Sequence, residues 1–355
     1  MHMADALISP AVGGTMWAAS VGLAAYSAHK LRTENMEHKA PLMGVLGAFV
    51  FAAQMINFTI PMTGSSGHLG GGLILAVLLG PYAAFLVMFS ILAVQALFFA
   101  DGGLLALGCN VFNLGFWTCF VAYPLIFRKM VGAKPRGGRL TGAAILAGVI
   151  GLQLGAFWVV LETLASGISA LPFGTFVLLM QPIHLGIGIV EGLVTAALVA
   201  YIWKARPELL ALPGTPQSGG AVGIRPVIVF FAIATLVTGM MLSWFASTHP
   251  DGLEWSMFKT SGHEELEAPP AGVHATLAGV QEKTAFMPDY SFKAPEETAE
   301  AAPAAEAVTT GPVEEAAAWP AVSAGTSVAG LVGGAIVLLV AGLTGFALRA
   351  VRRPA

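Results

Sequence analysis

Two histidines near the start of the chain have the surroundings of metal ligands. The sequence begins Met1-His2, and His68 lies in a nearly uncharged, glycine-rich loop at residues 63–72. A histidine in second place lets the α-amine, its own backbone nitrogen and its imidazole Nδ1 close fused chelate rings in one plane. A second imidazole at the remaining corner would complete a square of nitrogens, which suits Ni(II) or Cu(II). We therefore predict a metal site formed by Met1, His2 and His68; the plain alternative is a histidine that stands second by chance.

Further polar residues stand inside apolar segments. Gln54 and Asn57 lie three residues apart near the end of one segment. They are predicted to orient His68 or the N-terminal segment that begins Met1-His2, called the tail below. The alternative is a hydrogen bond between helices. His184 and Glu191 lie seven residues apart on one face of another helix. Ionisable groups within membrane spans are costly and usually functional, and for this pair we favour a polar contact between helices over direct contact with the ion.

The composition is that of a membrane protein. Of the 355 residues, 56% are apolar and 10% are charged, and the apolar blocks of about 20 residues have the length of a helix that crosses a bilayer. The formal net charge of −3 gives no indication of a nucleic-acid partner. Cys109 and Cys119 stand ten residues apart in one apolar stretch, and we expect them to pack in a core rather than bind metal.

Several signatures are missing from the sequence. It has no G-x-x-x-x-G-K-[ST] motif, so we expect no bound ATP in this chain. No arrangement of Ser, His and Asp indicates catalysis, so we do not expect an enzyme. No basic leader with a cleavage site precedes the first apolar run, and Met1 is therefore expected to remain on the mature chain.

Nine apolar segments are predicted to be transmembrane helices. Gly80-Pro81 divides a longer apolar run into two short helices, and Asp101 is expected to end or cap the second. With nine crossings, 14 of the 17 basic residues fall on one side, which is then cytoplasmic. The N-terminus and His68 then face outward, and the C-terminus lies inside. The predicted segments are 9–28, 41–61, 71–82, 83–100, 104–127, 141–162, 175–203, 225–247 and 326–348.

The chain divides into two membrane units. Residues 1–205 form the first unit, and the proline- and glycine-containing segment 206–224 is predicted to be a cytoplasmic linker. The second unit, 225–348, holds a long outer loop at 248–325 with 13 of the 20 acidic residues. The part of this loop from about 294 to 320 is rich in Ala, Glu and Pro and is predicted to be disordered.

These residues resemble the substrate-binding (M) membrane subunit of energy-coupling factor transporters for nickel and cobalt, over roughly residues 1–205. The resemblance is carried by Met1-His2, residues 64–71 and 94–103, Gln54 to Phe58, His184 to Gly188, and Glu191-Gly192. The second unit resembles the small accessory (N) subunit of these systems, fused to the first. Its markers are Pro250-Asp251-Gly252-Leu253-Glu254 and Met287-Pro288-Asp289-Tyr290, and this fusion resembles the nickel branch more than the cobalt branch.

The resemblance implies an all-α polytopic membrane protein with a seven-helix substrate-binding unit and a two-helix accessory unit. It implies that the tail enters the bundle and binds the ion through Met1, His2 and His68. It further implies Ni(II) as transported substrate, a separate transmembrane coupling subunit and cytoplasmic ATPases as partners, and the inner membrane of a bacterial cell. Asp251 and Glu254 are then expected to dock the accessory unit on the first.

Three alternatives remain open at this point. The same transport could serve Co(II), because nitrogen ligands accept both ions. The chain could instead be a secondary metal transporter that works alone, which would not co-purify with ATPase subunits. It could also be a metal sensor or storage protein, which would bind metal but support no uptake.

Overall fold

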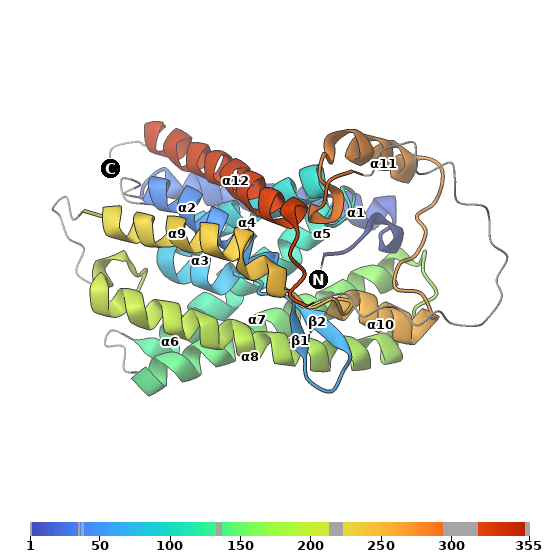
Figure 1. Ribbon diagram of the computed structural model, residues 1–355, viewed down its shortest axis with the longest axis horizontal. Coiled ribbons are helices and arrows are strands. Elements are labelled where there is room, and N and C mark those ends of the chain that lie inside the picture. The colour runs from blue at the N-terminus through green and yellow to red at the C-terminus, as the bar shows by residue number, and fades with distance from the viewer. Residues whose placement is uncertain are drawn as a thin grey trace.

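The computed structural model describes residues 2–34, 36, 39–132, 137–212, 223–293 and 319–351, and the protein is a bundle of helices that run along its long axis (Figure 1). A π-helical stretch, Phe112–Phe127, joins α5 and α6 into one continuous helix. The helices of the bundle are α1 (Pro10–Leu31), α2 (Lys39–Gln54), α3 (Gly72–Leu79), α4 (Pro81–Phe99), α5 (Leu107–Val111), α6 (Arg128–Val131), α7 (Gly137–Ser166), α8 (Phe173–Ala205), α9 (Arg225–Met240) and α12 (Ala324–Ala350).

Each of the nine predicted segments contains a helix, so the helical membrane architecture is confirmed. Five stretches within the described residues are long and apolar enough to cross a bilayer. The predicted break at Gly80-Pro81 is present, because Gly80 has φ +81° and Pro81 begins α4. The five stretches are Pro81–Phe99, Leu107–Val131, Gly137–Ser166, Phe173–Ala205 and Ala324–Ala350, while Lys39–Gln54 and Arg225–Met240 are shorter apolar helices.

The predicted segment 41–61 is wrong in its last part. Helix α2 ends at Gln54, and the chain then forms an antiparallel hairpin of β1 (Phe58–Ile60) and β2 (Ser65–Gly67). Met62 and Gly64 have positive φ in the turn between them. The two strands satisfy one another's backbone groups outside the helical conformation. Strand β2 is buried, whereas Thr59 of β1 and Met62 in the turn are exposed.

Helix α3 reaches only part of the way through the bundle. Its 8 residues give a length of about 12 Å, far less than the roughly 30 Å of a hydrocarbon core. At its C-terminal end the carbonyl of Val77 accepts a 2.8 Å hydrogen bond from the backbone N–H of Ala211, beyond the end of α8. Helix α3 therefore starts within the bundle, and the loop that carries His68 lies at this internal start.

The second unit packs directly on the first. Helices α9 and α12 both contact α2 and each other (Figure 1). Glycines permit the close approach: a Cβ on Gly44 of α2 would lie 2.7 Å from the carbonyl oxygen of Leu338, and one on Gly330 would overlap the backbone of Gly239. Small residues at helix crossings are the usual means of tight packing in membranes.

The outer loop of the second unit also contains two helices, which the sequence did not predict. They are α10 (Gly252–Ser261) and α11 (Val273–Thr284). The ring Nε2 of His274 on α11 hydrogen-bonds the carbonyl of Ile8, and Gln281 donates to the carbonyls of Ala96 and Gly102. The loop thus covers the segment that follows the tail. The stretch predicted to be disordered lies outside the described residues, apart from its last two positions.

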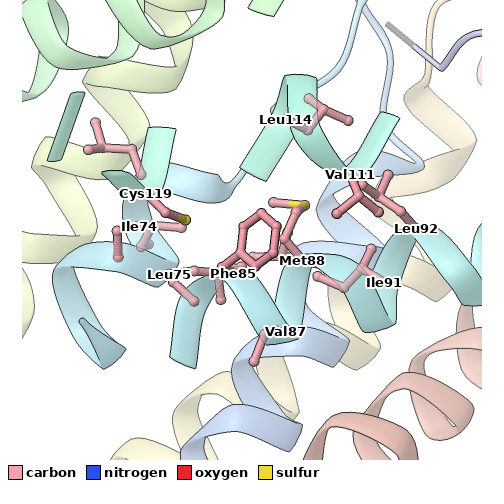
Figure 2. Packing of buried hydrophobic residues seen from close by; sticks show 14 of the residues in the cluster. Ile74, Leu75, Phe85, Val87, Met88, Ile91, Leu92, Val111, Leu114 and Cys119 are labelled. Atoms are coloured by element: carbon pink, nitrogen blue, oxygen red, sulfur yellow. The ribbon is translucent and has the colours of Figure 1, made fainter. Parts of the chain in front are cut away.

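The bundle core is apolar and contains both cysteines. Figure 2 shows Phe85 and Met88 of α4 among side chains of the neighbouring helices, with Cys119 beside Ile74. Cys109 and Cys119 are buried and unpaired, which confirms that they are packing residues.

Candidate metal centre

The tail is held inside the first unit by backbone and side-chain hydrogen bonds. Met3 is fully buried; its N–H donates to Oδ1 of Asn110 at 2.8 Å, and its carbonyl accepts from the N–H of Gly103 at 2.9 Å. Asp5 accepts a 2.9 Å hydrogen bond from the N–H of Ala106. A Cβ on Gly103 would overlap the Asp5 carboxylate, so only glycine allows this approach. These contacts place His2 at a defined position; Met1 lies outside the described residues.

The His2 ring is held by a carboxylate. Its Nδ1 lies 2.7 Å from Oδ1 of Asp101, and Oδ2 of Asp101 accepts a 2.5 Å hydrogen bond from the Tyr290 hydroxyl. Burial alone would raise the pKa of Asp101, but His2 and the Tyr290 hydroxyl hold it at about 2. As expected, Asp101 lies just after the end of α4, where its N–H bonds the carbonyl of Gln95; its carboxylate also links the tail to the second unit. A chelate through Nδ1 requires the His2 ring to turn away from Asp101.

His68 lies against His2. The two rings are stacked, with centroids 4.9 Å apart and planes inclined by 15°. Nδ1 of His68 is 2.9 Å from the carbonyl of Leu69 and must carry the proton, because a carbonyl only accepts. Within the described part of the chain, Nε2 of His2 and Nε2 of His68 are buried without a partner. Burial lowers the pKa of His68 to about 3, so this imidazole is neutral and able to bind metal at physiological pH.

Buried polar side chains fix the loop around His68. Nε2 of Gln54 donates to the carbonyl of Gly70 at 2.8 Å, and Gln54 in turn accepts from Gln95 at 2.9 Å. The Glu191 carboxylate accepts from the N–H of Gly71 at 3.0 and 3.1 Å. Gly71 has φ +75°, a conformation that favours glycine. The structure therefore places Gln54 as a support of the loop that carries the histidine.

Three other predicted residues have different surroundings from those expected. The Asn57 carbonyl accepts a hydrogen bond from Ser247 N–H, while its side-chain Oδ1 is buried without a partner among the described residues. Asn57 therefore joins the first unit to the second through its backbone, and no contact with His68 is found for its side chain. Glu191 holds a loop backbone rather than another helix, and His184 lines the same small cavity as His68.

The second unit closes one side of the site. Ser66 donates from its backbone N–H to the carbonyl of Pro250 and from its hydroxyl to the carbonyl of His249, both at 2.8 Å. The motif Pro250 to Glu254 forms a turn that caps α10: Asp251 accepts from the N–H groups of Leu253 and Glu254, and Glu254 accepts from the N–H of Asp251. This capping box is visible in the sequence as an aspartate with a glutamate three residues later.

A small cavity lies beneath this turn. Its volume is about 10 Å³, and it is lined by Gly67, His68, Gly70, Leu114, Leu152, His184, Ile187, Asp251 and Gly252. No three His, Cys, Asp or Glu side chains are grouped as metal ligands in the described ranges. A site here with four nitrogen ligands would therefore need nitrogens from the backbone or the amine, as the sequence predicts.

Gly252 provides a test of how closely the second unit must approach α8 of the first unit. A Cβ at this position would lie 2.7 Å from Cγ2 of Ile183 and 3.4 Å from Cε1 of His184. Gly252→Val is expected to force the turn away from α8 and to cost about 1–3 kcal/mol of stability. The melting temperature of the purified protein in detergent measures this loss. Gly279→Val is the control, because a Cβ there meets nothing within 4 Å; equal losses in both variants would show that the close approach does not matter.

Together the fold and the site define a helical membrane protein with a buried imidazole site closed by its second unit. Residues 2–209 match the family described as the cobalt uptake substrate-specific transmembrane region, and residues 225–350 match the PDGLE domain. The chain therefore belongs to the family of substrate-specific transmembrane components of cobalt and nickel transport, with a fused PDGLE domain. It is a metal transport protein.

Known relatives include proteins named for nickel transport and a protein named for cobalt transport. The chain is 31% identical over 313 residues to the fused nickel transport protein NikMN of Rhodobacter capsulatus, covering 82% of this chain and 88% of that protein. It is 36% identical over 240 residues to a putative fused nickel transport protein of Archaeoglobus fulgidus, covering 66% and 76%. The cobalt transport protein CbiM of Geobacter sulfurreducens is 29% identical over 254 residues, covering 68% and 71%. A solved transition metal transporter aligns with a TM-score of 0.51 at 30% identity, over 58% of this chain and 93% of the other.

Proposed function

We propose that this chain binds Ni(II) as a transported substrate through four nitrogens: the α-amine of Met1, the backbone nitrogen and Nδ1 of His2, and Nε2 of His68. The observation that supports it most is the stacking of the His2 and His68 rings, with Nε2 of His68 buried and without a partner in the described chain. Buried polar atoms are nearly always paired, so Nε2 of His68 has the character of a ligand. Nδ1 of His2 contacts Asp101 and becomes available to the ion when the ring turns.

Nickel is favoured over cobalt by the ligand set and by the relatives. A planar square of nitrogens that includes a backbone amide suits Ni(II), and two relatives that carry the fused arrangement are named for nickel transport. Co(II) is the second candidate, because another relative is named for cobalt transport.

The chain would work as the substrate-binding part of a larger importer. We assign residues 1–205 to metal binding, 206–224 to a cytoplasmic linker and 225–348 to the accessory unit. A separate transmembrane coupling subunit and cytoplasmic ATPases would supply the energy, because the sequence has no phosphate-binding motif of its own. We place the chain in the bacterial inner membrane, and the distribution of basic residues supports an N-terminus outside and a C-terminus in the cytoplasm.

Uptake into cells separates this proposal from its rivals. Cells that express the chain together with coupling and ATPase subunits should accumulate radioactive nickel, and cells with an inactive ATPase should not. A chain that works alone would accumulate nickel in both. Binding without any accumulation would indicate a sensor or storage protein, and faster uptake of cobalt in competition would assign the substrate to cobalt.

The affinity for Ni(II) is expected to rise steeply with pH between about 6 and 8. The backbone amide must lose its proton on binding, and the α-amine, with an ordinary pKa of about 8, must be neutral. The pKa of His68 is about 3, so its ring is neutral throughout this range and adds nothing to the slope. Titrations of the purified chain with Ni(II) at several pH values measure the slope; an affinity that stays constant would exclude the amide and amine as ligands.

A further inference from the structure

His184 on α8 has an arrangement that the proposed four-nitrogen site does not use. Its side chain is 1% exposed, and its Nδ1 lies 2.8 Å from the carbonyl of Met180. Because that carbonyl can only accept, Nδ1 carries the proton and Nε2 presents a bare lone pair. This buried Nε2 has no partner among the residues that the structure describes.

His68 has the same arrangement as His184. Each ring gives its Nδ1 proton to a main-chain carbonyl, and each leaves a buried Nε2 without a described partner. Both side chains line the cavity beneath the turn of the second unit, together with Asp251. A volume of about 10 Å³ is close to that of one water-sized sphere, so the cavity has room for a single ion.

This pattern separates ligating histidines from structural ones. Metal-bound histidines almost always donate their other ring N–H to a carbonyl or carboxylate, which fixes the ring and its tautomer. In the described ranges, the histidines with a buried ring nitrogen that lacks a partner are His2, His68 and His184. By contrast, the buried His274 uses Nε2 to bond the Ile8 carbonyl.

We propose that Nε2 of His184 and Nε2 of His68 hold the metal ion at a second position, before the tail nitrogens complete their square around it. The proposal rests on the proposed function, since His68 serves both positions. The ion passes between the two positions by exchanging His184 for nitrogens of the tail. Neutral imidazole nitrogens suit Co(II), Ni(II) and Zn(II) alike, so selection for one metal would occur at the square.

The second position can be isolated by removing the tail chelate. The full chain carrying His2→Ala, purified in detergent, is titrated with Co(II) and followed by visible absorption. We expect a weaker site for one ion, whose absorption is that of nitrogen-bound Co(II). Adding His184→Phe keeps a ring in place but removes the lone pair, and affinity should fall at least 10-fold. His263→Phe in the same background is the control, because that histidine is exposed in the outer loop and should leave the titration unchanged.

Two outcomes would overturn the second position: no Co(II) binding by His2→Ala, or equal binding with and without His184→Phe. His184→Gln serves as a further variant of similar size, and both variants must match their parent in helix content and melting temperature without metal. If both fail this match, the number of imidazole ligands around Co(II) in the parent, measured by X-ray absorption, decides instead, and fewer than two imidazoles overturn the proposal. Failure of the proposed function looks different, because His2→Ala would then bind Ni(II) as tightly as the unaltered chain.

Discussion

His2→Ala is expected to lower the affinity for Ni(II) by more than about 100-fold. The loss of a residue that only supports a ligand costs roughly 10–100-fold, and this variant loses an imidazole that belongs to the same chelate as the amine and amide. Its effect on the fold should be small, because the tail is anchored by the hydrogen bonds of Met3 and Asp5 with Asn110, Gly103 and Ala106. Calorimetric titration of the purified chain measures the affinity.

The matched control for His2→Ala is His263→Ala. It removes the same side chain from an exposed position in the outer loop and should leave the affinity unchanged. A His2→Ala variant that binds nickel as tightly as this control would place the ion elsewhere in the protein.

His68→Ala is expected to weaken nickel binding by at least about 10-fold, but by less than His2→Ala. It removes one nitrogen that water can replace, while the chelate of the tail remains. The visible spectrum should also change, because water is a weaker ligand than imidazole and the low-spin Ni(II) band should fade. The measurement is a titration with absorption detection on both variants.

The ranking of the two variants is itself a test. An affinity of His68→Ala equal to that of the unaltered chain would remove His68 from the ligands. A larger loss for His68→Ala than for His2→Ala would show that the loop, and not the tail, supplies most of the binding energy. Unchanged melting temperatures are required for either conclusion, because the loop packs against Gln54 and Glu191.

Local chemistry explains what the sequence could predict. Apolar runs define the helices, Gly80-Pro81 defines the break before α4, and the chelating geometry of a second-place histidine singles out His2. The contact between the His2 and His68 rings follows from the same reasoning. Each of these inferences uses neighbouring residues or the coordination preferences of one ion. None of them requires knowledge of the tertiary fold.

The features that were missed depend on contacts between distant residues. Asp101 bonds Tyr290 from the second unit, and Ser66 bonds Pro250; neither partner can be identified from a local pattern. The β1–β2 hairpin continues an apolar run and becomes stable only where its strands pair. The capping box that begins α10 was the one local signal available for the outer loop.

The most direct test of the metal centre is a titration of the purified full chain with Ni(II), Co(II) and Zn(II), followed by visible absorption. A square of four nitrogens should bind one Ni(II) per chain with a yellow, low-spin band, and it should bind Zn(II) more weakly because zinc prefers a tetrahedron. Zn(II) binding tighter than Ni(II), without the yellow band, would contradict the four-nitrogen site.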